Sequence, residues 1–452
     1  MPLAGDAGTR GALRERALPT AGPLAFTIGN WFTWTAVGIG FPGVGISLVA
    51  VARLLARGAW EAPPVLASTH IATLGWVTMT IIGAAAQMAP ALLGARVRGE
   101  ATLPYLYGVF TVSAALLVVG FLGGRFVLAA VGGAGVALAS LWFVALMLWT
   151  ARAARSRPAS MPLHLPVAFV CLGLVTLWGT MLAANLSLGF WPGLLVGHRG
   201  LVVHLALGLG GWFGLMVVGT FYRLVPLIHG ARVASRSRGL AVLLLAGWAI
   251  VSTFGGVAGR LDWSLRVAAL SAAAALVLLA VEVGHVLQHR RSRAPDLNVR
   301  HWYAVLGYSI VLAGVAVAWS LGAVRSGPPD RLGECVAVLF LLGWVTQAVI
   351  GQLYKIAPFL MWYYRSTIPD VPAISRRPDL YSPPVGSGVF WASNTGVVLM
   401  TIGIWERAAT IAEAGAVAIA LSAFGLAYML AYRWIPPVLS GRLAFEWRWR
   451  IS

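Results

Sequence analysis

Long apolar runs recur along the whole chain and are separated only by short gaps, which contain most of the basic residues. Of the 452 residues, 59% are hydrophobic and 10% are charged, whereas soluble domains are typically about 25% charged. A water-soluble fold of this composition would lack the polar side chains that must cover its core. A helix of about 20 apolar residues instead spans the hydrocarbon core of a bilayer. The sequence therefore predicts an all-α polytopic membrane protein.

Twelve transmembrane helices are predicted, because an apolar run in lipid must satisfy its own backbone polar groups. Their ranges are 24–52, 64–94, 102–123, 126–150, 162–190, 200–228, 238–259, 266–289, 301–323, 334–362, 386–405 and 410–434. They form a single integral membrane domain over residues 24–434, with an N-terminal tail of residues 1–23 and a C-terminal tail of residues 435–452. No linker marks a second domain.

The formal charge of +19 follows from 33 basic and 14 acidic residues. Most of the basic residues lie in the tails and in the loops after even-numbered spans. The positive-inside rule therefore places both termini in the cytoplasm, and we expect a multi-pass protein of the bacterial inner membrane. This layout explains the charge through the lipid bilayer, so no nucleic-acid partner is expected. The only cysteines, Cys171 and Cys335, cannot form a disulfide framework or a cysteine-based zinc site.

The second, sixth and tenth spans share the pattern Gly-Trp-x6-Gly-x6-Pro. Its residues are Gly75, Trp76, Gly83 and Pro90, then Gly211, Trp212, Gly219 and Pro226, and finally Gly343, Trp344, Gly351 and Pro358. Glycines seven residues apart lie on nearly one helix face and allow close helix packing, while the proline can kink or end the helix. Because the copies recur every four spans, the pattern predicts three four-helix arcs around a pseudo-threefold axis.

Three arcs of four helices are also the plan of subunit I of the haem-copper oxidase superfamily, which includes nitric oxide reductases. The chain resembles that superfamily over essentially all its spans. The segments 221–226 and 353–358 look like span ends of its C-family branch. The resemblance implies a haem-ligating histidine on the second span and a copper-ligating histidine on the sixth.

Three histidines lie near the predicted outer ends of these spans. His70 and His204 occupy nearly equivalent positions of two repeats, and His198 precedes His204. Ionisable side chains inside a bilayer are functional candidates, and imidazole ligates haem iron and copper. By the resemblance, His70 matches the ligand of a b-type haem, and His204, or less well His198, matches a copper ligand. A structural role, with each ring bonded to a helix carbonyl or placed at the interface, stays open.

The departures from the superfamily pattern are large. It has a histidine pair on the seventh span and two histidines on the tenth, but residues 238–259 and 332–362 contain none. Glu334 and Cys335 are the nearest substitutes. A complete copper–haem centre and a proton-pumping oxidase are therefore not expected, and no catalytic residue is assigned.

Two functions fit the sequence. In the first, His70 together with His204 or His198 binds one haem b or one metal ion. Haem b is the first choice of cofactor and copper is the second. It would serve electron transfer or nitric oxide and dioxygen chemistry or sensing, as in an oxidoreductase subunit with a periplasmic electron donor or copper protein. In the second, the scaffold holds no cofactor and passes copper or haem as a transporter or assembly factor. Both functions are compatible with a homo- or hetero-oligomer.

The polar residues at the predicted cytoplasmic ends have a simpler interpretation. We expect their histidines to lie at the lipid headgroups. These are His164, His229, His285, His289 and His301. Glu282, His285 and His289 share one helix face, which permits a metal site, although the adjacent arginines favour a solvated face. Arg223 and Lys355 are expected to reach the headgroups, or alternatively to attract an anion.

Overall fold

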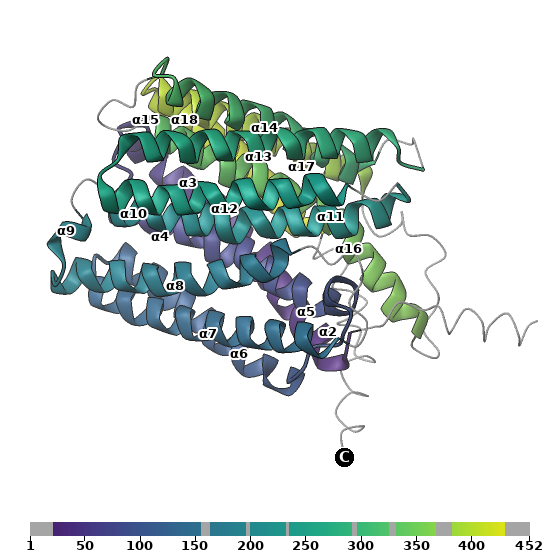
Figure 1. Ribbon diagram of the computed structural model, residues 1–452. Helices are drawn as coiled ribbons and strands as arrows, with labels where there is room; N and C mark the ends of the chain where they lie inside the picture. The colour runs from purple at the N-terminus through teal and green to yellow at the C-terminus, as the bar shows by residue number, and fades with distance from the viewer. Residues whose placement is uncertain are drawn as a thin grey trace, which may run out of the picture.

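The computed structural model describes residues 21–154, 163–195, 199–231, 235–291, 296–324, 331–367 and 382–429. Within these ranges the regular structure is entirely helical, and the long helices run side by side as one bundle (Figure 1). Twelve of the helical segments are long and apolar enough to cross a membrane. Each overlaps its predicted range and differs from it by a few residues at the ends. The prediction of an all-α polytopic membrane protein is therefore confirmed.

The spans, numbered in chain order, are built from the following elements. Spans 1 to 4 are Pro23–Ala56 (α2, η1 and α3), Pro63–Leu93 (α4, η2 and α5), Glu100–Leu122 (η3 and α6) and Phe126–Ala153 (α7). Spans 5 to 8 are His164–Leu188 (α8), Arg199–His229 (α10, η5 and α11), Arg236–Gly259 (α12) and Asp262–Gln288 (α13). Spans 9 to 12 are Leu297–Ser320 (α14), Arg331–Leu360 (α15, η6 and the first part of α16), Pro383–Trp405 (α17) and Ala409–Met429 (α18).

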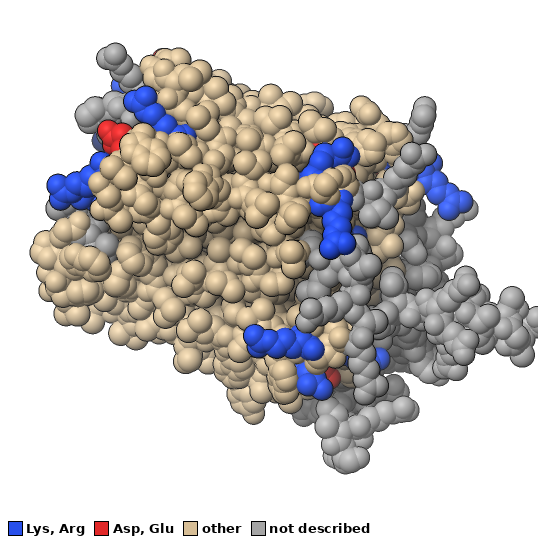
Figure 2. All heavy atoms as spheres, in the orientation of Figure 1, with Lys and Arg blue, Asp and Glu red and all other residues tan. Residues whose placement is uncertain are grey.

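Charged side chains lie at the two ends of this bundle. On the face shown in Figure 2, lysine and arginine gather at both ends, and a broad band without charge lies between them. A band of this kind suits the hydrocarbon core of a bilayer, where a charged side chain would be costly. The fold is thus a membrane domain, while the side on which its termini lie stays a prediction.

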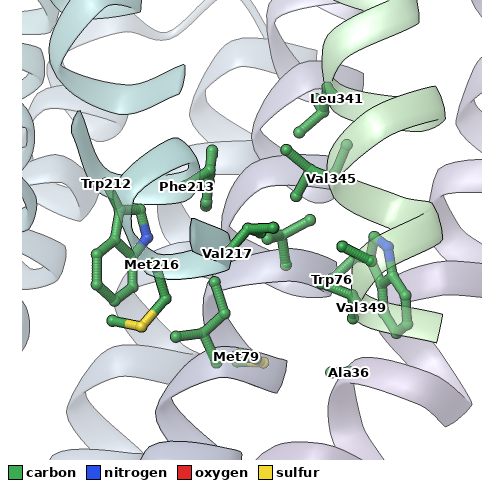
Figure 3. Packing of buried hydrophobic residues seen from close by; sticks show 14 of the residues in the cluster. Ala36, Trp76, Met79, Trp212, Phe213, Met216, Val217, Leu341, Val345 and Val349 are labelled. Carbon is green, nitrogen blue, oxygen red and sulfur yellow. The ribbon is translucent and has the colours of Figure 1, made fainter. Parts of the chain in front are cut away.

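The outer helices pack in three series. The helix α7 packs against both α6 and α8, the helix α13 packs against both α12 and α14, and the helix α18 packs against both α17 and α3. Spans 2, 6 and 10, which carry the repeated pattern, contact one another. Apolar side chains fill the space between them, among them Met216, Val217 and Val345 (Figure 3).

All three repeats contain a π-helical segment that the sequence pattern did not predict. These segments are η2 (Ile71–Thr78), η5 (Ala206–Gly214) and η6 (Leu339–Val345), and each contains the Gly-Trp pair. Such segments are rare and are often found at functional sites. A further one, η1 (Ala36–Gly40), lies in span 1, where Gly40 packs directly against the backbone of Gly75. In spans 2, 6 and 10, the Gly-Trp pair therefore lies in the segment where the α-helix changes to a π-helix.

The three motif tryptophans are at most 1% exposed, and each indole N–H has a hydroxyl partner. Trp212 donates to Thr78 of span 2 (3.1 Å), and Trp76 donates to Thr346 of span 10 (3.3 Å). These acceptors occupy the same position relative to their own tryptophan. The corresponding residue of span 6 is Gly214, which has no hydroxyl, and Trp344 donates instead to Ser309 of span 9 (2.8 Å). Two hydrogen bonds thus join span 6 to span 2 and span 2 to span 10.

The motif prolines do not end their helices. The helix α5 (Met79–Leu93) continues past Pro90, and α11 (Leu215–His229) continues past Pro226. Both helices end at a glycine in the left-handed region, Gly94 with φ of 80° and Gly230 with φ of 58°. Since glycine adopts this conformation without a Cβ clash, it is the glycine that stops each helix.

Candidate functional site

His70 lies at the end of α4 (Pro63–His70), immediately before η2. Its Nδ1 is 2.7 Å from the Leu66 carbonyl oxygen, one helical turn earlier. Because a carbonyl oxygen only accepts, Nδ1 carries the proton in the neutral ring and Nε2 keeps its lone pair. The ring also stacks on Phe121 of α6, with centroids 5.0 Å apart. One hydrogen bond and one aromatic contact thus fix the orientation of a potential ligand.

His204 lies at the corresponding end of α10 (Arg199–Leu205), before η5. Its ring packs on Gly179 of α8 so closely that a Cβ there would be 2.7 Å from Cε1 of the imidazole. Its Nδ1 is buried and has no partner with hydrogen-bond geometry within the described residues, although the Val175 carbonyl lies near the ring. The imidazoles of His70 and His204 are close enough for their charges to interact. The two predicted residues therefore lie within range of an electrostatic interaction.

The other residues that were considered for this end are placed differently. His198 lies outside the described residues. Glu334 is ion-paired with Arg407 (3.3 Å), and the Cys335 thiol donates to the carbonyl of Thr401 in span 11 (3.6 Å). Neither side chain thus replaces a missing histidine beside the pair.

The contacts of the two imidazoles also differ from those that the oxidase resemblance implies. There, the histidine of span 2 would share a haem with span 10, and the histidine of span 6 would face span 7. Here, Phe121 of span 3 stacks on His70, and Gly179 of span 5 packs on His204.

The opposite end of the bundle contains histidines that the sequence interpretation misplaced at the lipid headgroups. His164 is 3% exposed and His301 is 0% exposed. The His164 ring stacks on Tyr222 at 5.5 Å, and the His301 ring lies 5.6 Å from Tyr354. These tyrosines are equivalent residues of two repeats, so the pairing itself is repeated.

The second motif glycine explains how each histidine becomes buried. A Cβ on Gly219 would be 3.1 Å from the Cβ of His164, and a Cβ on Gly351 would be 2.8 Å from the Cβ of His301. The absence of a side chain at each motif glycine therefore lets the preceding span pack closely against it. The histidine of that span lies at this point of close approach and is buried there. The signal for this pairing in the sequence is the similar spacing of each histidine from its tyrosine.

His301 belongs to a buried polar network between spans 9, 10 and 11. Its Nδ1 donates to the Gln347 side-chain oxygen (2.6 Å), and Nε2 of Gln347 donates to Ser393 (2.9 Å). Asn394 donates to the same Gln347 oxygen (3.2 Å) and accepts from Tyr308 (3.1 Å). These bonds satisfy most of the buried polar groups, which suits a structural network.

The remaining polar residues at this end are also engaged within the protein. Nε2 of His229, at the end of α11, donates to Asn298 (2.7 Å), so this half-buried histidine has a partner within the protein. Nε of Arg223 donates to the Ala91 carbonyl (3.0 Å), and Lys355 is ion-paired with Asp296. These bonds tie Arg223 and Lys355 to neighbouring segments, which weakens both the headgroup and the anion interpretations.

The proposed metal site of Glu282, His285 and His289 would need the Glu282 carboxylate as a ligand, but this carboxylate is already engaged. Glu282 is ion-paired with Arg238 and accepts a bond from the Ser235 backbone N–H (2.7 Å). Within the described ranges, no group of three or more histidine, cysteine, aspartate or glutamate side chains is arranged to hold a metal ion. A site at His70 and His204 would therefore have two protein ligands from these residue types.

Comparison with known proteins adds no assignment, since no protein-family model and no curated protein matches the chain.

Proposed function

We propose that His70 and His204 together bind one transition-metal ion at the predicted outer end of the membrane domain. The scaffold would be a divergent form of haem-copper oxidase subunit I, with its three arcs around a pseudo-threefold axis. The ion would serve electron transfer or chemistry with nitric oxide or dioxygen. The observation that carries this proposal is the hydrogen bonding of two imidazoles from nearly equivalent positions of two repeats, Nδ1 of His70 being bonded to Leu66 and Nδ1 of His204 being buried, with the two rings within range of an electrostatic interaction.

The hydrogen bonding of the two rings supports metal binding. Metal-ligating histidines usually donate their second ring N–H to a carbonyl or carboxylate, and the bond from His70 to Leu66 has this form. The buried Nδ1 of His204 has only the Val175 carbonyl near it, without hydrogen-bond geometry, and a poorly satisfied buried nitrogen is costly. A bound ion would remove that cost if Nδ1 is the ligating atom.

The packing around the rings favours a bare ion over a porphyrin. Phe121 covers one imidazole and the Gly179 backbone lies against the other. A porphyrin would have to displace these neighbours, whereas a bare ion is far smaller.

Imidazole ligands suit copper, iron, zinc and nickel, of which copper and iron would supply one-electron chemistry and bind diatomic gases. The protein would hold the His70 proton on Nδ1, orient both rings and surround the site with apolar side chains. With two side-chain ligands, the ion would keep open coordination positions for a small molecule.

The test is metal analysis with an optical spectrum of the full-length protein, purified from cells supplied with copper and iron. We expect stoichiometric copper or iron in the wild type and its loss in His70→Ala and in His204→Ala. His289→Ala is the matched control, because this histidine is exposed and belongs to the opposite end. A Soret band lost in both site variants would replace the bare ion by a haem, and a protein without metal or haem would refute the proposal.

A further inference from the structure

A second feature of the inner helices is a cavity of about 100 Å³ between spans 2, 6 and 10, with span 1 and Trp302 of span 9 completing its wall. Ala84, Thr220 and Gln352 all line it and occupy the same position after the tryptophan of their own repeat. The cavity therefore lies where the three repeats face one another, nearer to the motif prolines than the tryptophans are. Neither His70 nor His204 belongs to its wall.

Two side chains in this wall have buried polar atoms without partners. Gln352 is 8% exposed, and neither its amide nitrogen nor its amide oxygen has a hydrogen bond to the described residues. Trp302 is 1% exposed, and its indole N–H also has no partner there. Buried polar groups are nearly always hydrogen-bonded, so two such groups on one cavity indicate an occupant.

Three of the other polar groups of the wall already have partners. The hydroxyl of Thr80 donates to the Trp76 carbonyl, and that of Thr33 donates to the Gly29 carbonyl. The Gln87 amide donates to Asn30 (2.8 Å). Among the described residues of the wall, the buried polar atoms without a partner are the Trp302 indole nitrogen and the amide nitrogen and oxygen of Gln352.

The rest of the wall determines the character of the occupant. It consists mainly of apolar side chains, including Trp34, Met88, Met216 and Leu353, and it contains no charged residue. An ion would be unpaired in such surroundings. Each buried water needs two to four polar partners, and the few free groups cannot supply several waters. An uncharged molecule with one polar group and an apolar remainder matches the wall better.

We propose that this cavity binds the head of an uncharged amphiphile of the alcohol class. The hydroxyl oxygen accepts from the Trp302 indole and the Gln352 amide nitrogen, and the hydroxyl proton is donated to the Gln352 oxygen. An apolar cavity of about 150 Å³ holds benzene, so only the head and the first carbons fit within the walls. The proposal does not depend on metal binding by the histidines.

The test is photolabelling of the full-length protein in phosphatidylcholine vesicles with a diazirine derivative of 1-octanol, followed by peptide mass spectrometry. We expect labels on wall residues such as Met88 and Met216, with competition by 1-octanol but not by octane. Trp302→Phe and Gln352→Leu should each raise the concentration for half-maximal labelling about tenfold, the effect of losing one buried hydrogen bond. Thr253→Val is the control, since Thr253 lines a different cavity, between spans 6, 7, 8, 9 and 10.

A third variant keeps the test decisive if either substitution prevents folding. Ala84→Phe fills the cavity and leaves both polar groups in place, so it should abolish the competed labels. Labels outside the cavity, equal competition by octane, or labelling unchanged in the variants that fold would overturn the proposal. Loss of labelling in Thr253→Val would also contradict it.

Discussion

At the scale of single residues, the two candidate ligands differ in how they are held. His70 is fixed by its bond to Leu66 and by Phe121, whereas the His204 ring is held by close packing on Gly179. A side chain at residue 179 would enter the space of the imidazole, so the ring would have to move. The choice of both histidines rests on their depth, their nearly equivalent positions and the superfamily resemblance, and their role as ligands stays a prediction. The sequence could not predict Phe121 or Gly179, because these contacts join helices that are far apart in the chain.

Gly179→Ala should therefore lower the affinity for copper about tenfold, at the lower end of the effects of residues that orient metal ligands. The new Cβ, 2.7 Å from Cε1 of His204, would rotate the ring away from its present orientation. The measurement is an equilibrium titration of the purified protein with Cu(I) against a competing chelator. Gly108→Ala is the control, since no atom lies within 4 Å of a Cβ at that residue. An unchanged affinity in Gly179→Ala would show that this packing does not orient a ligand.

At the scale of helices, the motif tryptophans connect the repeats. Span 6 is bonded to span 2 through Trp212 and Thr78, and span 2 is bonded to span 10 through Trp76 and Thr346. The hydropathy of the sequence predicted the spans well, because any apolar run of this length must cross the bilayer as a helix. It did not predict the π-helical segments, since their residues are as apolar as the turns around them.

Thr78→Val should destabilise the protein by about 1–3 kcal/mol, because it leaves the buried Trp212 N–H without an acceptor at nearly constant volume. Thr73→Val is the control, as its hydroxyl bonds only to Thr69 in the preceding turn, on an exposed face. The measurement is the unfolding of both variants in the same detergent micelles. Equal stabilities of the two variants would contradict the account of the tryptophan bonds.

Gly214→Ser tests whether the three repeats are equivalent. In a Ser309→Ala background, Trp344 has lost its acceptor, and a hydroxyl at residue 214 would lie where Thr78 and Thr346 accept in the other repeats. We expect Gly214→Ser to restore about 1 kcal/mol in this background and none in the wild type, a coupling that a double-mutant cycle measures. Equal effects in both backgrounds would argue against a pseudo-threefold arrangement.

At the scale of the whole molecule, the packing of the outer helices in three series supports the proposed arcs. The sequence interpretation was weakest for polar residues near the ends of spans. It assigned His164 and His301 to the lipid headgroups, because a one-dimensional pattern cannot tell a buried helix crossing from an interfacial residue. Their burial depends on Gly219 and Gly351 of the following span.

The predicted orientation has a direct test in single-cysteine variants. Arg57 and Arg96 are exposed and lie in successive loops, which are at opposite ends of span 2. In right-side-out spheroplasts, a membrane-impermeant maleimide should label Arg57→Cys and leave Arg96→Cys unlabelled until the membrane is opened. The natural cysteines, Cys171 and Cys335, are buried and should give little background. The reverse labelling would place both termini outside.

The measurement that tests the central claim most directly is a copper titration of the wild type, His70→Ala, His204→Ala and the double variant. A shared site predicts one ion per wild-type chain and more than about 100-fold weaker binding in either single variant, beyond the effect of residues that only orient a ligand. The double variant should then bind no more weakly than the single variants. Wild-type affinity in either single variant, or independent losses that add in the double variant, would contradict a site formed by both histidines.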